Sequence, residues 1–146
     1  MSSGFQRTDH TSDEGIRVWG STGKELFEEA AKGLISVLVD RNTVESKEVL
    51  RLNIMSENVE GLFLQWLREI LYLVETEGMV FSRFQIEKDN ISLRNAESFF
   101  LSASIGGEKI NPLRHGICKE IKSVTRHGFY IKKGNPWWEA NILFDV

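Results

Sequence analysis

Acidic side chains occur near both ends of this chain, next to segments that are otherwise apolar. The run DHTSDEGIRV places His10 and Asp13 just before an apolar stretch, and Asp145 immediately precedes the last residue, Val146. Carboxylate oxygens are the ligands that hard cations such as Ca²⁺ and Mg²⁺ take from proteins. Acids that lead into a strand also serve to keep a loop in water. The residues alone therefore leave a metal site and a solvated loop as open alternatives.

The alternation of residues 137–146 determines the side on which Asp145 lies. Successive side chains of a strand point to opposite faces of the sheet. One face carries Trp138, Ala140, Ile142, Phe144 and Val146, and the other carries Trp137, Glu139, Asn141, Leu143 and Asp145. If the apolar face packs on helices, the Asp145 carboxylate points away from the core. Such a strand at a chain end is unusual, because termini fray unless they are tied down.

Positive charge is concentrated in one segment of an acidic chain. Residues 109–133 contain seven Lys or Arg and one acid, Glu120, so this segment has a net charge of +6 within a chain of −3. A basic stretch of this kind is able to hold a phosphate or another anionic partner. It is more often typical of solvated strand and loop positions. Charge alone does not decide between the two.

Length and composition indicate one globular domain. The chain has 146 residues, of which 41% are hydrophobic and 27% charged, and we assign residues 1–146 to a single domain. Its one cysteine excludes an intramolecular disulfide, which fits a reducing compartment. The first residues, MSSGFQRTDH, lack the apolar core of a secretory signal. We therefore expect a cytoplasmic protein.

The hydrophobic periods predict strands and helices in a definite order. Thr22 and Glu25 form a capping box at the start of one helix, and a second helix is expected over residues 58–75. Strands are expected at 14–20, 47–55, 79–87, 90–95, 98–107, 120–133 and 137–146, with turns at 89–90, 106–107 and 134–136. The pattern predicts an α+β fold, a two-layer sandwich in which two helices pack on a mostly antiparallel sheet.

Four separated motifs resemble the archease family. They are DHTSDEGIRVWG, LFLQWLREILYL, RHGICKEIKSVTRHGF and the terminal ILFDV, and their order and spacing match over nearly the whole chain. The resemblance implies a non-catalytic protein that assists the RNA-splicing ligase, which joins a 3′-phosphate or 2′,3′-cyclic-phosphate RNA end to a 5′-hydroxyl. It implies promotion of GMP transfer from GTP onto the active-site histidine of the ligase, so that the ligase turns over repeatedly.

The resemblance also implies a metal site at the two ends of the chain. Asp13 matches the acid of the first family motif, Asp145 the penultimate acid, and Val146 the last residue. Together they would form an all-oxygen site for Ca²⁺, with Mg²⁺ or another divalent cation as an alternative. His10 lies in the first motif, either as a hydrogen-bonding support for Asp13 or as a polar loop residue.

Further positions match cationic residues of the family. Arg114, His115 and Lys122 are implied to contact nucleotide phosphate or an acidic surface of the ligase. Without the resemblance, Lys122 reads as an exposed strand lysine. The chain departs from the family at Asn111, where an acid is common, and at Glu14, where an apolar residue is usual. We expect Glu14 to point away from Asp13 if this segment is extended.

Two other classes of function are alternatives to a ligase activator. A metal-dependent phosphoesterase lacks support, because the chain shows no second cluster of acids and histidines and no Gly-rich phosphate loop. A small RNA-binding module also lacks support, since it would be expected to interleave aromatic and basic residues more fully than this chain does. We therefore expect no enzymatic activity of its own.

Overall fold

The computed structural model describes residues 2–9 and 13–146. The elements, in chain order, are β1 (Gly4–Asp9), β2 (Asp13–Gly20), α1 (Gly23–Leu38), η1 (Arg41–Thr43), β3 (Glu48–Ser56), α2 (Val59–Glu77), β4 (Met79–Asp89), β5 (Phe99–Lys109), α3 (Pro112–His115), β6 (Ser123–Lys133) and β7 (Trp138–Asp145). Within the described ranges, no helix is long and apolar enough to cross a membrane.

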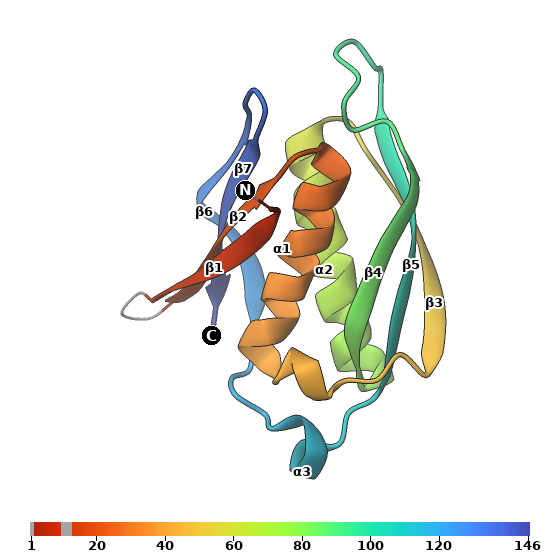
Figure 1. Cartoon of the computed structure of the whole chain (residues 1–146), viewed down its shortest axis with the longest axis vertical. Coiled ribbons are helices and arrows are strands. Elements are labelled where there is room, and N and C mark those ends of the chain that lie inside the picture. Colours follow the sequence, from red (N-terminus) through yellow and green to blue (C-terminus); the bar gives the residue numbers. More distant parts are fainter. Residues whose placement is uncertain (1, 10–12) are drawn as a thin grey trace.

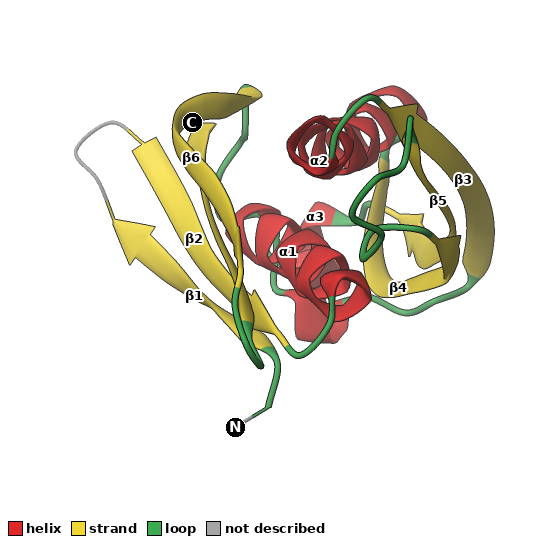
Figure 2. Ribbon diagram, turned by 90° about the horizontal axis from the view of Figure 1, so that it is seen from above, coloured by secondary structure: helices red, strands yellow, loops and turns green. Residues whose placement is uncertain are grey.

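Helices α1 and α2 lie between two antiparallel sheets (Figure 2). One sheet has four strands in the order β1-β2-β7-β6, and the other has three in the order β3-β5-β4. The β6–β7 hairpin and the β4–β5 loop reach the top of the molecule, whereas α3 lies at the bottom (Figure 1). The predicted α+β class, with two helices packed on antiparallel strands, is confirmed. The strands form two sheets rather than one, so the helices are covered on both sides.

Helix α1 has two sides that pack against strands, which explains why there is a second sheet. On one side Gly33 approaches β2 so closely that an added Cβ would lie 2.8 Å from Cδ1 of Ile16. On another side the Glu28 carboxylate accepts a hydrogen bond from the main-chain nitrogen of Ile86 in β4, at 2.8 Å. A helix that has to be covered on two sides buries more surface between two sheets than on one.

Both long helices begin where local capping signals place them. The Thr22 hydroxyl accepts a hydrogen bond from the main-chain nitrogen of Glu25 at 3.1 Å, which confirms the predicted N-terminus of α1. The Asn58 side chain caps α2 by accepting from the nitrogen of Gly61 at 2.7 Å. Helix α2 ends at Glu77, and the capping residue Gly78 has a φ of 61°, the left-handed conformation that glycine adopts most easily.

The predicted strand at 90–95 is wrong, because this segment is the loop between β4 and β5. The Asn90 side chain holds both ends of the loop, accepting from the nitrogen of Phe100 at 2.8 Å and donating to the carbonyl of Ser98 at 3.0 Å. Ile91 is buried, with 2% of its surface exposed. Ile91 therefore anchors the loop, whereas Leu93 is exposed, and the two do not belong to a strand.

The predicted turn at 106–107 is also wrong, since both glycines lie inside β5 and pair with β3 and β4. Their lack of side chains serves close packing: a Cβ added to Gly107 would lie 2.0 Å from the carbonyl oxygen of Val80. The structure also contains a strand that was not predicted, β1, in which Phe5 is the single large apolar residue. With one large apolar residue, β1 has no alternating hydrophobic pattern by which a strand is predicted.

Candidate functional site

Asp13 and Asp145 stand directly opposite each other in the ladder that joins β2 and β7. Opposed residues of an antiparallel pair point to the same face, with Cβ atoms roughly 4.5–5.5 Å apart. Asp13 is half-buried and Asp145 is exposed. The fold therefore brings together two carboxylates that are 132 positions apart in the chain, at one end of the four-stranded sheet.

The burial of β7 confirms the predicted orientation of Asp145. Trp138, Ala140, Ile142 and Phe144 are buried in the core, so the alternate side chains, including that of Asp145, point outward. Val146 is partly buried and packs against the core. This packing holds the last residue, which follows Asp145 directly in the chain.

Lys122 lies beside Asp145 through the main chain. Its nitrogen donates a hydrogen bond to the carbonyl oxygen of Asp145 at 2.7 Å, and its side chain is exposed. The segment that carries it is held in place by Cys118, whose nitrogen donates to the carbonyl of Leu38 at 2.9 Å. Asp13 and Lys122 therefore lie on the two segments whose main chains flank Asp145.

Glu14 is the unexpected buried acid of this region. It alternates away from Asp13, as predicted. Its side chain is buried, with 1% of its surface exposed, and binds Arg7 of β1 and the Lys119 ammonium, the latter at 2.8 Å. Burial raises the pKa of Glu14, but the hydrogen bonds from Lys119 and Arg7 outweigh it and leave the pKa below its usual value. This ion-pair cluster ties the segment before Lys122 to β2. Sequence reasoning missed Arg7 because it lies on the unpredicted strand.

His115 is fully buried and does not form part of a contact surface, so its predicted role in binding a partner or nucleotide is corrected. Its Nδ1 accepts a hydrogen bond from the nitrogen of Asn111 at 2.9 Å, which places the proton of the neutral ring on Nε2. Nε2 then donates to the carboxylate of Glu108 at 3.2 Å. Both ring nitrogens are thus used inside the protein.

Arg114 pairs with the same buried acid from the surface. Its guanidinium forms an ion pair with Glu108, and its side chain is exposed. The main-chain nitrogen of Glu45 donates to Glu108 at 2.6 Å, and this bond, the His115 bond and the Arg114 pair outweigh burial and lower the pKa of Glu108 to about 2. Asn111 caps α3 by accepting from the nitrogen of Leu113 at 3.1 Å, which gives its neutral side chain a structural role.

These two acid clusters predict a loss of stability on acidification. Glu14 and Glu108 have folded pKa values below their ordinary values, so they stabilise the fold above about pH 4.5 and lose that contribution as the pH falls through the folded values. Urea unfolding at pH 7, 5 and 3 should show a steep drop in the free energy of unfolding below pH 4.5. Glu108→Gln should be less stable at pH 7 and should show a shallower drop. An unchanged pH dependence in this variant would contradict the assignment.

The chemistry of the Asp13–Asp145 pair suits a hard divalent cation. Among the described residues, no three His, Cys, Asp or Glu side chains gather closely enough to hold a metal ion. The pair therefore offers two carboxylates, and a third oxygen would come from Val146 beside it. Such a donor set consists only of oxygen, which fits Ca²⁺ or Mg²⁺ and not a soft metal. His10 falls outside the described residues, so its predicted supporting role stays a prediction.

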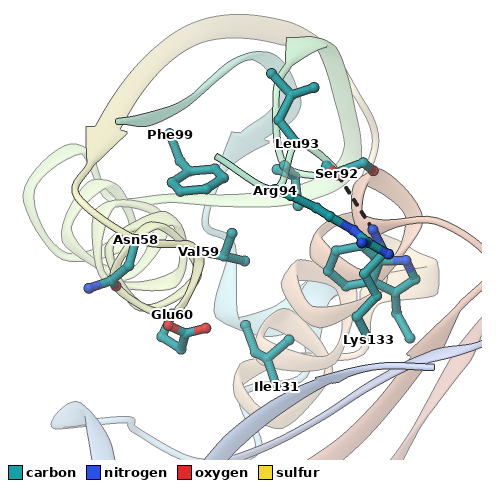
Figure 3. Close-up of a pocket in the computed structure, with 11 residues that line it drawn as sticks. Asn58, Val59, Glu60, Ser92, Leu93, Arg94, Phe99, Ile131 and Lys133 are labelled. Atoms are coloured by element: carbon teal, nitrogen blue, oxygen red, sulfur yellow. Dashed lines mark hydrogen bonds between the residues drawn. The ribbon is translucent and has the colours of Figure 1, made fainter. Parts of the chain in front are cut away.

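A separate hollow of about 320 Å³ lies at the top of the molecule, between the start of α2, the β4–β5 loop and the β6–β7 hairpin (Figure 3). Its walls are mainly apolar. Lys133 is one of the lining residues, and its ammonium donates a hydrogen bond to the carbonyl oxygen of Ser92 at 3.4 Å. The Lys133 ammonium also lies 5.3 Å from the ring centre of Trp138. Its lining contains one acid, Glu60, so it offers no paired carboxylates of the kind that Asp13 and Asp145 provide.

Comparison with known proteins decides the family. The sequence profile of the Archease protein family matches residues 5–146. The chain belongs to the archease family. The archease of Pyrococcus abyssi is 33% identical over 143 residues, covering 97% of this chain and 98% of the relative. That of Thermococcus gammatolerans is 36% identical over 145 residues, with coverage of 97% and 98%.

Solved structures agree with this archease fold. The solution structure of protein 1598 of Methanobacterium thermoautotrophicum is 31% identical, with a TM-score of 0.84 and coverage of 98% of this chain and 99% of that one. The crystal structure of a Thermotoga maritima archease, described as a possible chaperone, has a TM-score of 0.62 at 18% identity, covering 97% and 96%. The latter likeness concerns the fold alone.

Proposed function

We propose that this protein is a non-catalytic, cytoplasmic activator of the RNA-splicing ligase that joins 3′-phosphate and 5′-hydroxyl ends. In this role it promotes guanylylation of the active-site histidine of the ligase and so permits multiple turnover. The observation that carries the proposal is the pairing of Asp13 with Asp145 across β2 and β7, beside Val146 and Lys122. Membership of the archease family supports it.

The residues at this end of the sheet have separable tasks. Asp13 and Asp145, with an oxygen of Val146, would hold a Ca²⁺ ion, which supplies positive charge against the triphosphate of GTP when it is bound. Glu14, through Lys119, keeps the following segment against β2. That segment presents the exposed ammonium of Lys122, which is free to pair with a phosphate or a carboxylate of the ligase.

The test is a guanylylation assay with the matching ligase, GTP and Mn²⁺. Wild-type protein should raise the rate of GMP transfer, and Asp13→Ala should not. If Asp13→Ala stimulates like wild type, the site assignment fails. Hydrolysis of a generic phosphodiester that is lost in Asp145→Ala would instead indicate a metal-dependent phosphoesterase. Tight, steeply salt-dependent binding to naked RNA would indicate an RNA-binding module.

Lys122→Ala should lower stimulation without affecting the metal site. Loss of a charge-assisted hydrogen bond costs about 1.5–3 kcal/mol, which corresponds to roughly a 10- to 150-fold weaker effect on the ligase. The main-chain bond from Lys122 to Asp145 does not depend on the side chain, so calcium-dependent stabilisation should persist. Lys122→Arg, which keeps the charge, is the control. Equal stimulation by Lys122→Ala and wild type would show that the Lys122 ammonium makes no contact on which stimulation of the ligase depends.

A further inference from the structure

The outer face of the β1-β2-β7-β6 sheet presents aromatic residues on the side away from the helices. In β2 the buried residues Ile16 and Val18 point inward, so Arg17 and Trp19 point outward. Trp19 and Trp137 are half-buried and line a hollow of about 350 Å³ together with Gln6, Arg17, Trp138 and Glu139. In Figure 2 the opposite face of this sheet is the one that packs on α1.

Neighbouring groups hold Trp19 in place. Gly4 of β1 stands directly opposite it in the ladder, and a Cβ added to Gly4 would lie 3.1 Å from the indole ring. The indole nitrogen donates a hydrogen bond to the carbonyl oxygen of Ser2 at 2.8 Å. A glycine opposite the tryptophan leaves room for the ring to lie against the strand. The hollow is therefore preformed, and filling it costs little ordering entropy.

The polar groups beside the hollow are also held in fixed positions. Glu139 accepts hydrogen bonds from Arg17 at 3.1 Å and from the hydroxyl of Tyr130 at 2.7 Å. The Lys132 ammonium lies 4.9 Å from the ring centre of Tyr130. Trp, Tyr and Arg are the residue types that dominate the binding energy of protein interfaces. With two cations and one acid, this end of the face has an excess of positive charge.

The same face leads directly to the candidate metal site. Positions 13, 15, 17 and 19 of β2 alternate to one side, so Asp13 and Trp19 share the outer face and lie roughly 20 Å apart at about 3.3 Å per residue. The face is acidic at Asp13 and Asp145 and basic around Arg17 and Lys132. An uneven charge distribution of this kind favours a single orientation of a bound partner.

Building on the proposed function, we infer that this outer face is the surface that docks on the ligase. The Trp19–Trp137 hollow receives an apolar side chain of the ligase that is flanked by carboxylates, complementing Arg17 and Lys132. This contact holds the Asp13–Asp145 end over the nucleotide site, roughly 20 Å away along the strand. The hollow thus supplies affinity, whereas the acidic end supplies the activating effect.

Titrating the ligase with variants separates these two contributions. Trp19→Ala and Trp137→Ala should raise the concentration for half-maximal guanylylation at least roughly 30-fold, the effect of losing an interface hot spot, with an unchanged plateau. Their calcium-dependent rise in Tm should match wild type. Phe100→Ala is the matched control, because Phe100 is an exposed aromatic residue on the other sheet, 37% accessible. Trp19→Phe should restore most of the affinity.

The possible outcomes distinguish this inference from the proposed function. If wild type stimulates the ligase and both Trp variants behave like Phe100→Ala, the docking face is wrong and the proposed function stands. If wild type fails to stimulate, the proposed function is wrong and the inference falls with it. If the Trp variants lose binding to single-stranded RNA but keep the half-maximal ligase concentration, the face binds nucleic acid, and the inference is overturned.

Discussion

Asp145→Asn is expected to abolish both the stabilisation of this protein by calcium and its stimulation of the ligase. The substitution keeps the size of the side chain and removes one of the two carboxylates that face each other across β2 and β7. At a calcium concentration 100 times the Kd, wild type should gain about 2.7 kcal/mol of stability, equivalent to a rise in Tm of roughly 5–10 °C. The variant should show almost none of this rise.

The same substitution should have a different effect in the absence of calcium. Like charges directly opposed on a sheet repel each other, so removing one in EDTA should leave Tm unchanged or slightly higher. Differential scanning calorimetry with and without calcium measures both effects. Glu48→Gln, which removes an exposed carboxylate from β3 in the other sheet, is the control and should respond like wild type. A full calcium-dependent rise in Asp145→Asn would exclude this carboxylate as a ligand.

The elements near the candidate site were predictable because their signals are local. Thr22 and Glu25 identify the start of α1 within four residues, and the alternation of β7 already orients Asp145 outward. The proximity of Asp13 to Asp145 is not a local feature, because it depends on the pairing of β2 with β7. Hydrophobic periodicity contains no such information, so that part of the site came from family resemblance and not from physical reasoning on this chain.

The division of the strands into two sheets could not be predicted for the same reason. A half-buried strand has the same alternating pattern in either sheet. His115 shows a related limit: its sequence neighbours are Arg114 and Gly116, and only the fold reveals Glu108 beside its ring. Of the two cationic residues, His115 is buried against Glu108, whereas Arg114 pairs with the same acid from the surface. Burial of polar groups depends on tertiary partners, which spacing along the chain does not disclose.

The glycines at 106–107 lie inside β5 and do not form the predicted turn, and their close packing leads to a large expected effect. Gly107→Ala should lower the free energy of unfolding by about 3 kcal/mol, at the upper end of the cost of overpacking a core. The added Cβ would lie 2.0 Å from the carbonyl oxygen of Val80 and 2.8 Å from Cα of Phe81. These are main-chain atoms of β4, so relief requires the strand itself to move.

Gly106→Ala is a matched control one residue away. There the nearest atom to an added Cβ is the hydroxyl oxygen of Ser46, at 2.0 Å, which belongs to an exposed side chain that can rotate. Neither glycine has a positive φ, so backbone strain does not contribute to either substitution. The comparison therefore measures only the steric clash of the added Cβ. Thermal unfolding should show a fall in Tm of roughly 6–12 °C for Gly107→Ala and a much smaller change for Gly106→Ala. Equal losses in the two variants would mean that close approach of β4 to β5 is not what requires glycine at position 107.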